Sequence, residues 1–246
     1  MADSAGVVIP AAGSGERMGG QRKQLRTLGG HPVWLQTLVP FLRIEAVRRI
    51  VLVVDPELTA GMRSELVSAV EQGGRFPERM REIVEFADGG ATRFDSVEAG
   101  IQTLSASRDH SAGAPPDWIL VHDAVRPFVR RKEIERLIDS VRAHGAAALA
   151  VPAVDTLRRV TEDRFAETVP REEVVRMQTP QGAAREWFLA AYDGETGGSS
   201  VTDEVELLQR AGRSVRLVRG SSRNFKITTP ADWELAQALW QTLHAS

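Results

Sequence analysis

The residues best suited to chemistry lie near the start of the chain, in the stretch 7–18 and at Lys23. An apolar, β-branched run leads there into small residues and two glycines, and the cations Arg17 and Lys23 follow. Small residues let a ligand approach the backbone, and successive N–H groups in such a loop form an anion-binding concavity. Arginine adds a bidentate fork and lysine a point charge. The combination suits a polyphosphate, most simply a nucleotide triphosphate; the alternative is a plain strand-to-loop turn with surface cations.

Two familiar glycine-rich motifs do not fit this loop. A P-loop ends in Gly-Lys-Ser/Thr, and this loop has no such ending. A dinucleotide-binding fingerprint needs a third glycine where Met18 stands. It also needs an acidic residue about twenty positions later, at the end of a second strand, and none is present. An NAD-dependent oxidoreductase is therefore excluded.

A second cluster contains Asp88, Gly89 and Gly90 at the end of an apolar run, with Ser96 shortly after. The glycine pair would let a flat nucleobase lie against the main chain, and the Ser96 hydroxyl could bond to the edge of the base. The alternative is a tight turn in which Asp88 caps a helix. Both interpretations stay open from the sequence.

A third cluster contains His122, Asp123 and Arg126 after another apolar run. A carboxylate in this position can hold Mg²⁺ against phosphate oxygens, because Mg²⁺ takes one or two protein carboxylates and completes its shell with phosphate and water. The alternative is a structural Asp–Arg pair. His122 is expected to pack or to bond to the backbone. No Ser, His and Asp set has nucleophile-elbow spacing, which excludes a hydrolase of that type.

The composition bounds the class of protein. The chain has 246 residues, 42% of them hydrophobic and 26% charged, which fits one globular domain with or without an appendage. A net charge of −2 argues against binding to nucleic acid or to a membrane surface. The absence of cysteine excludes disulfides, zinc–thiolate sites and thiol nucleophiles. No signal peptide or membrane span is predicted, so the expected location is cytoplasmic.

Short apolar runs alternate with longer amphipathic ones along the first two thirds of the chain. Strands are expected at 6–9, 49–54, 83–86, 118–121 and 146–151, and helices at 33–42, 57–72, 93–104 and 132–144. This alternation predicts an α/β fold with a mostly parallel twisted sheet and helices on both faces. Ligands bind at the carboxyl ends of such strands, so Gly13, Asp88 and Asp123 should converge on one edge.

The alternation breaks after Pro152. Residues 153–177 are expected to form an extended β-arm that protrudes from a single domain spanning 1–246. An isolated two-stranded arm is marginal in water, so we expect it to pack on a partner. The remaining expectations are helices at 184–192, 203–210 and 230–243, and a strand pair at 214–218 and 224–228.

Seven segments, taken in order, closely resemble the 2-C-methyl-D-erythritol 4-phosphate cytidylyltransferase family. They are IPAAGSGERM with KQ, DGGATRFDSV, HDAVRPF, VDTLRR, QTPQ, VTDE and NFKITTP, and they span residues 6 to 233. The resemblance implies a Rossmann-like nucleotidyltransferase of isoprenoid precursor biosynthesis. Such an enzyme joins CTP to the 4-phosphate of methylerythritol, a small polyol phosphate, and gives CDP-methylerythritol and pyrophosphate. The resemblance also implies a need for Mg²⁺ and a homodimer whose arms interlock.

The resemblance also assigns roles to residues. Arg17, Lys23 and Lys226 would be catalytic, on the triphosphate and the α-phosphorus, and Asp123 would bind the metal. The residues implied for ribose and cytosine are Ala11, Ala12, Gly13, Gly15, Asp88, Gly89 and Ser96. The residues implied for the methylerythritol phosphate are Arg126, Thr179 and Thr202. Thr156 and Arg171 would also bind it: the arm would carry them across the dimer into the partner's pocket.

Some features depart from this pattern. Arg223 and Asn224 stand where related sugar nucleotidyltransferases often have a second metal-binding acid, and Val125 replaces an alanine. HDAVRPF, with residues 217–220, is also similar to ribitol-5-phosphate cytidylyltransferases, whereas DSV and TDE favour the methylerythritol branch. CTP:ribitol-5-phosphate cytidylyltransferase is thus the alternative function. A nucleotide-binding regulator without catalysis is a more distant one.

Overall fold

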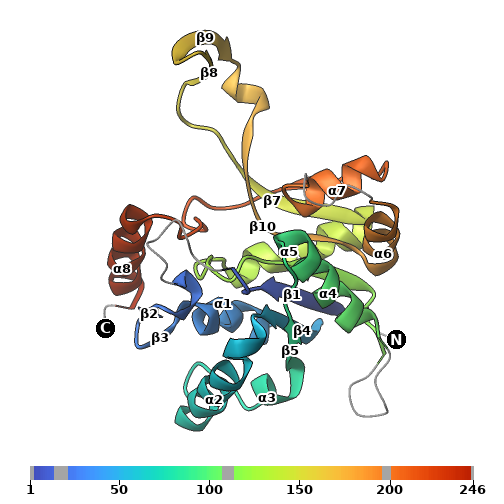
Figure 1. Ribbon diagram of the computed structural model, residues 1–246, viewed down its shortest axis with the longest axis vertical. Helices are drawn as coiled ribbons and strands as arrows, with labels where there is room; N and C mark the ends of the chain where they lie inside the picture. The colour runs from blue at the N-terminus through green and yellow to red at the C-terminus, as the bar shows by residue number, and fades with distance from the viewer. Residues whose placement is uncertain (1–2, 14–21, 107–113, 196–200, 245–246) are drawn as a thin grey trace.

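A central mixed sheet organises the molecule (Figure 1). The computed structural model describes residues 3–13, 22–106, 114–195 and 201–244. The strands of this sheet are β1 (Ala5–Pro10), β4 (Val47–Val54), β5 (Val84–Asp88), β6 (Trp118–Val121), β7 (Ala146–Pro152), β10 (Val175–Ala184) and β11 (Arg216–Arg219). Their order is β11-β7-β10-β6-β1-β4-β5. β10 is antiparallel to both of its neighbours, and the other pairings are parallel.

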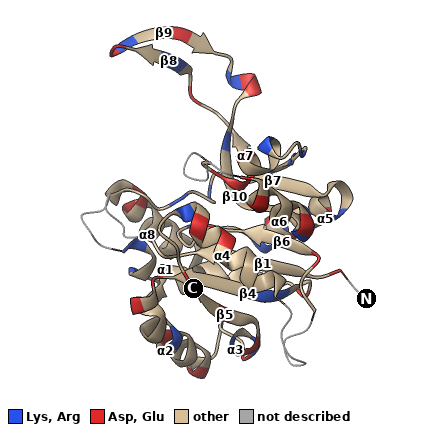
Figure 2. Cartoon of the chain, turned by 45° about the vertical axis from the view of Figure 1, so that its right-hand side comes forward, with Lys and Arg blue, Asp and Glu red and all other residues tan. Residues whose placement is uncertain are grey.

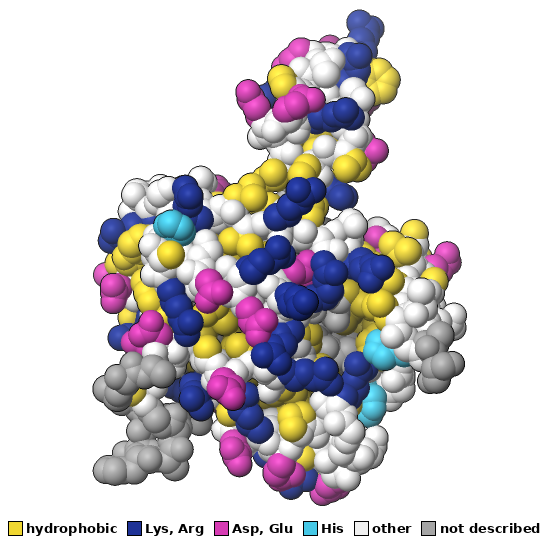
Figure 3. Space-filling view, turned by 180° about the vertical axis from the view of Figure 1, so that it is seen from behind, with side chains coloured by type: hydrophobic (Ala, Val, Ile, Leu, Met, Phe, Trp, Pro, Cys, Tyr) yellow, Lys and Arg dark blue, Asp and Glu magenta, His cyan; other side chains and the backbone are white. Residues whose placement is uncertain are grey.

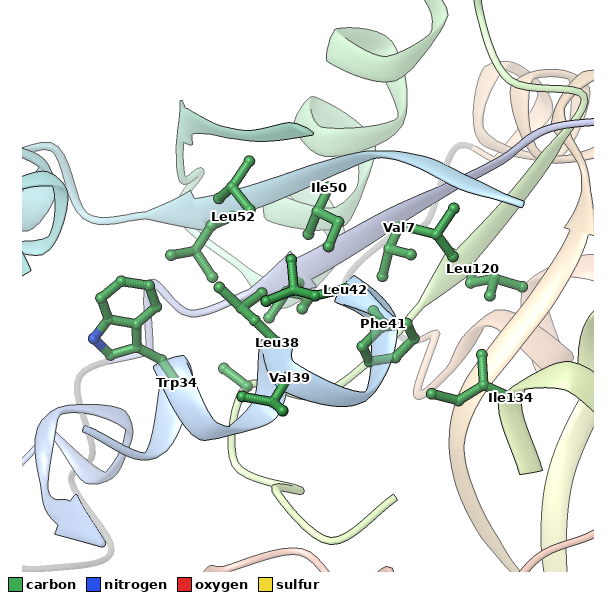
Figure 4. Close-up of a cluster of buried hydrophobic side chains, with 14 of the residues drawn as sticks. Val7, Trp34, Leu38, Val39, Phe41, Leu42, Ile50, Leu52, Leu120 and Ile134 are labelled. Carbon is green, nitrogen blue, oxygen red and sulfur yellow. The ribbon is translucent and has the colours of Figure 1, made fainter. Parts of the chain in front are cut away.

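Helices cover both faces of the sheet. They are α1 (Val33–Leu42), α2 (Pro56–Gln72), α3 (Arg79–Ile83), α4 (Arg93–Ser105), α5 (Arg131–His144), α6 (Arg185–Gly194) and α7 (Glu204–Arg210), whereas α8 (Pro230–His244) packs on a separate cluster. One buried cluster joins the sheet to α1, α2, α3 and α5, as Figure 4 shows for part of it. A second joins the opposite face to α4, α6 and α7. In β1, Val7 and Ile9 belong to the first cluster and Val8 to the second. The strand is therefore buried on both faces, which explains why its sequence is apolar without alternation.

The C-terminal helix α8 covers a smaller cluster beside a short hairpin of β2 (Thr27–Leu28) and β3 (His31–Pro32). Trp233 and Ala236 of α8 pack there with Leu28 and Ile227. The short helix η2 (Lys23–Leu25) precedes this hairpin. The packing brings Ile227 and α8 against Leu28 and Val33 (Figure 1). The two predicted catalytic lysines, Lys226 and Lys23, lie next to these two segments in the sequence.

A second hairpin projects from the body. It contains β8 (Leu157–Thr161) and β9 (Arg164–Val169), which pair only with each other within the described part of the chain, and η3 (Arg171–Glu173) follows. Its root lies between β7 and β10, where Val175 pairs with Pro152. The hairpin carries both charge signs (Figure 2) and exposes the apolar side chains of Val154, Val160 and Phe165.

The structure confirms the expected α/β fold, and it corrects two expectations at the C-terminal side. Residues 175–177, expected to end the arm, begin β10, a ten-residue strand inside the main sheet. The predicted strand at 224–228 was wrong, and its expected partner is β11, which pairs with β7 instead. The backbone of this segment is bonded elsewhere: the carbonyl oxygen of Asn224 accepts from Arg126 and Gln178, and the N–H of Ile227 donates to the carbonyl oxygen of Val125.

Candidate active site

A cavity of about 430 Å³ opens beside the carboxyl ends of β1, β5 and β6. Its lining consists of Pro10, Ala11, Ala12, Gly13, Lys23, Gln24, Gly90, Ala91, Thr92, Arg93, Ser96, Asp123, Ala124, Val125 and Lys226. These strands are parallel, so the segments that follow them meet at one edge, as the sequence predicted. The three clusters found in the sequence therefore share one cavity.

The loop after β1 is held in place by hydrogen bonds on both sides. The N–H of Ala11 donates to the carbonyl oxygen of Val53 at 2.7 Å. The side chain of Gln24 donates to the carbonyl oxygens of Ala11 and Gly13, at 2.7 and 3.1 Å. Gln24 is therefore a loop-positioning residue to which the sequence analysis assigned no role. Gly15 and Arg17, predicted to bind and act on the nucleotide, lie outside the described residues.

Two of the three predicted catalytic cations line the cavity. Lys23, in η2, donates from Nζ to the carbonyl oxygen of Thr228 at 2.9 Å. Lys226 places Nζ 3.2 Å from Oδ2 of Asp123. The two lysines are about two hundred residues apart in sequence, and the packing of the segment before α8 brings them to one site.

Asp123 is a buried carboxylate surrounded by cations. Oδ2 accepts a hydrogen bond from Nε of Arg126 at 2.9 Å and contacts Lys226, and Nη2 of Arg93 lies 4.0 Å from Oδ1. Burial raises the pKa of Asp123, but the positive charges of Lys226, Arg126 and Arg93 outweigh burial and hold it well below its usual range. Asp123 is therefore ionised at neutral pH.

Asp123 fits the carboxylate that a nucleotide-bound magnesium ion needs. No group of three or more His, Cys, Asp and Glu side chains with metal-binding geometry occurs among the described residues. Mg²⁺ can nevertheless be held by one protein carboxylate together with substrate phosphates and water. Asp123 lies in the cavity wall, where phosphates could complete such a shell. Arg223 and Asn224 offer no second carboxylate.

Arg126 and Thr179, predicted to bind the acceptor, lie next to Asp123. Nη1 of Arg126 donates to the carbonyl oxygen of Asn224 at 2.8 Å. Oγ1 of Thr179 accepts from the N–H of Asp123 at 3.0 Å and lies 2.9 Å from Nδ1 of His122. Both side chains thus bond to the segment that carries Asp123 and help to fix it.

His122 is fully buried behind this carboxylate. Burial lowers the pKa of His122 to about 4, so the imidazole is neutral at physiological pH. Its Nε2 lies 3.2 Å from the carbonyl oxygen of Arg126. This environment agrees with the packing role expected from the sequence.

We expect His122 to make the protein sensitive to mild acid. The pKa of His122 in the folded state lies below its unfolded value of 6.5, so below pH 6.5 the unfolded chain takes up a proton that the folded protein does not. The free energy of unfolding is therefore highest above pH 6.5 and decreases as the pH falls towards 4. Between pH 7 and pH 5 the free energy of unfolding should drop by about 2 kcal/mol from this group alone. Urea unfolding at both pH values tests this. His122→Asn should have a smaller drop, and an equal drop in both proteins would contradict the assignment.

Asp88, Gly89 and Ser96, which are predicted to bind the base and ribose, lie around the start of α4. Gly89 is packed so closely that a Cβ there would come within 2.5 Å of Cβ of Ala12. Ser96 accepts from the N–H of Gly90 at 3.2 Å and donates to the carbonyl oxygen of Thr92 at 2.9 Å. Asp88 is exposed at the end of β5 and does not cap α4, because Thr92 does so with Asp95.

Several predicted residues are absent from the lining of this cavity: Asp88, Gly89, Arg126, Thr179, Thr202, Thr156 and Arg171. Thr202, before α7, bonds through both its N–H and its hydroxyl to Oε2 of Glu206, at 2.9 and 2.8 Å. Thr156 and Arg171 lie on the projecting hairpin segment and are exposed. Arg171 donates to the carbonyl oxygen of Val154 at 3.0 Å within the same segment.

The mixed α/β sheet and the cavity at its strand ends, with lysines and a carboxylate in its wall, are those of a nucleotidyltransferase. The family model described as 2-C-methyl-D-erythritol 4-phosphate cytidylyltransferase matches residues 5–242, and the chain belongs to this family. The resemblance found in the sequence is thereby confirmed.

Individual proteins similar to this chain carry the name of the same family or of the same activity. The enzyme of this name from Salinibacter ruber is 43% identical over 237 residues, covering 96% of this chain and 92% of its own length. That from Acidobacterium capsulatum is 37% identical over 241 residues and covers 94% of each chain. The crystal structure of the same enzyme from Thermus thermophilus has a TM-score of 0.72 and 30% identity, over 98% of this chain and 100% of that one. The 4-diphosphocytidyl-2C-methyl-D-erythritol synthase of Anaerococcus prevotii has a TM-score of 0.78 and 26% identity, over 97% and 96%.

Proposed function

We propose that this chain transfers CMP from CTP to 2-C-methyl-D-erythritol 4-phosphate in isoprenoid precursor biosynthesis. The observation that carries the proposal is the meeting of Lys23, Lys226 and Asp123 with the small-residue loop after β1 in one cavity. Positive side chains also gather over one face of the body below the hairpin (Figure 3), which suits ligands with several phosphate charges.

In the proposed reaction, an oxygen of the acceptor's phosphate attacks the α-phosphorus of CTP. The bond from the α-phosphorus to the oxygen bridging it to the β-phosphorus breaks, and pyrophosphate leaves. The attacking phosphate is already ionised at neutral pH, so no protein base is needed, and the neutral, buried His122 is left as a packing residue. Catalysis then consists of positioning the phosphates and stabilising the charge at the α-phosphorus.

We propose a part for each predicted residue. Lys23 and Lys226 would hold phosphate oxygens, together with Arg17. Mg²⁺, when bound by Asp123, would neutralise phosphate charge. The backbone of Ala11, Ala12, Gly13 and Gly15, with Asp88, Gly89 and Ser96, would bind the ribose and cytosine. These roles are our proposal, and each is open to substitution tests.

The acceptor site would be completed by a second copy of the chain. Arg126, Thr179 and Thr202 would bind the acceptor from one subunit, and Thr156 and Arg171 from the arm of its partner. The hairpin supports a homodimer, because two strands alone are marginal in water and Phe165 and Val160 are 83% and 61% exposed.

A panel of nucleotides and acceptors tests the function. Pyrophosphate release is measured with each of the four ribonucleoside triphosphates, and with methylerythritol 4-phosphate or ribitol 5-phosphate as acceptor. We expect turnover with CTP and the methylerythritol acceptor. Preference for ribitol 5-phosphate would establish the alternative function, and CTP binding without turnover in any combination would indicate a regulator.

Complementation tests whether the arm acts across a dimer. Arg171→Ala and Lys23→Met should each be nearly inactive, whereas a refolded equal mixture should regain about one quarter of the wild-type activity. Half of the dimers are then mixed, and one site in each mixed dimer has both an intact body and an intact arm. Recovery requires Arg171 to serve the partner's site. A mixture no more active than the average of its parents would contradict the exchange.

A further inference from the structure

Arg93 and Glu204 form an ion pair that the predicted roles do not use. Nη1 and Nη2 of Arg93 contact Oε1 and Oε2 of Glu204 at 2.8 and 2.9 Å, a bidentate geometry. The Glu204 side chain is 2% exposed, whereas that of Arg93 is 35% exposed and lines the cavity. The pair therefore has one buried partner and one partner facing the site.

The pair fixes the beginnings of two helices against each other. Arg93 is the first residue of α4 and Glu204 the first residue of α7. α7 is itself attached to the central sheet, because Gln181 of β10 accepts from the N–H of Val205 and donates to Asp203, both at 3.1 Å. Glu204 thus holds the guanidinium of Arg93 from a rigid support.

Among the described residues, the guanidinium of Arg93 makes no hydrogen bond besides those to Glu204, and Arg93 lines the cavity. A guanidinium has five N–H groups, and a bidentate carboxylate engages two of them. Nη2 of Arg93 also lies 4.0 Å from Oδ1 of Asp123. An arginine fixed along one edge is preorganised to bind a phosphate along another. A buried ion pair adds little net stability compared with apolar packing, so stability alone gives a weak reason for this one.

We propose that Arg93 binds the phosphate of the acceptor and that Glu204 is a positioning residue acting through Arg93. The proposal rests on the proposed function. Arg93 is the first residue of α4, which also carries Ser96, a residue predicted for the base. The proposal nevertheless places the guanidinium of Arg93 at the acceptor end, because its two charged contacts are with segments that hold predicted acceptor residues. Glu204 follows Thr202 by two residues, and Asp123 precedes Arg126 by three. Arg93 lies between these two segments.

Steady-state kinetics of Arg93→Lys and Glu204→Gln test the proposal. Lysine keeps the charge without the fork, and glutamine keeps the size without the charge. We expect KM for the acceptor to rise roughly 10- to 100-fold in Arg93→Lys and roughly 10-fold in Glu204→Gln, the range for a hydrogen bond to a charged group. KM for CTP should stay within about threefold. The double variant should be no worse than Arg93→Lys, because both changes remove one interaction.

Glu85→Gln is the matched control. Arg49 and Glu85 form another buried pair, with Nε and Oε1 2.9 Å apart, and Arg49 bonds to the carbonyl oxygens of Thr103 and Leu104 at the far end of α4. This control should lower the urea midpoint and leave both KM values unchanged.

Two outcomes would overturn the proposal. One is that Glu204→Gln behaves like Glu85→Gln, with lower stability and an unchanged KM for the acceptor. The other is that KM rises for CTP alone. If Glu204→Gln fails to fold, Arg93→Lys decides alone, by whether KM rises for the acceptor or for CTP. A wild-type chain without turnover would contradict the proposed function instead, and calorimetric binding of methylerythritol 4-phosphate to wild type and Arg93→Lys would still decide the role of Arg93.

Discussion

Lys23→Met is expected to lower kcat by roughly 10²–10³, the cost of removing one preorganised donor from a site where charge develops. Lys23 lines the cavity and is held by the carbonyl oxygen of Thr228, so its ammonium group needs little reorganisation during the reaction. Methionine retains most of the length of the side chain and removes the charge. The measurement is the rate of pyrophosphate release at saturating CTP and acceptor.

Lys132→Met is the control for this variant, because Lys132 is an exposed lysine at the start of α5 and is absent from the cavity lining. Its kcat should stay within about twofold of wild type, as for most surface substitutions. The role assigned to Lys23 would be wrong if its substitution left kcat within threefold of wild type.

Asp123→Asn should have the larger effect, a loss of at least roughly 10³ in turnover, because metal-ion charge stabilisation contributes several kcal/mol. The substitution also leaves Arg126, Lys226 and Arg93 without the anion that they surround. Activity is measured over a Mg²⁺ titration, in which wild type should saturate and the variant should not recover at any concentration.

Asp139→Asn, at an exposed carboxylate on α5, controls for a general effect of charge removal. Urea unfolding of Asp123→Asn separates lost chemistry from lost structure, because the variant must be folded at the assay concentration. Wild-type turnover with an unchanged Mg²⁺ dependence in the folded variant would rule out Asp123 as the metal ligand.

The parallel part of the sheet could be predicted because its strands are buried on both faces. Runs such as 49–54 contain little but apolar residues, and they alternate with amphipathic helices. β10 gave no such signal. Its buried residues include Gln178, Thr179 and Gln181, whose side chains bond to Ser221, Asn224, Asp123 and Asp203. A polar strand in a sheet interior depends on partners far away in sequence, and a local pattern cannot show them.

The candidate site likewise has residues that could be predicted from local sequence patterns and residues that could not. Residues directly after strands, such as Gly13 and Asp123, could be placed from the sequence because parallel strand ends share an edge. Gln24 and the Arg93–Glu204 pair were missed as positioning groups, since their partners lie 11 to 111 residues away. The segments KQ, DGGATRFDSV and VTDE contain Gln24, Arg93 and Glu204, but only the folded chain shows what these side chains contact.

The segment between β7 and β10, which carries the projecting hairpin, leaves the body and returns to it at adjacent positions. The N–H of Ala153 donates to the carbonyl oxygen of Val174 at 3.1 Å, directly beyond the pairing of Val175 with Pro152. The segment between those points can consequently gain, lose or exchange residues without breaking a hydrogen bond between strands of the central sheet. The dimer contact that we propose for this hairpin could therefore vary within the family while the central sheet and the cavity at its edge stay unchanged.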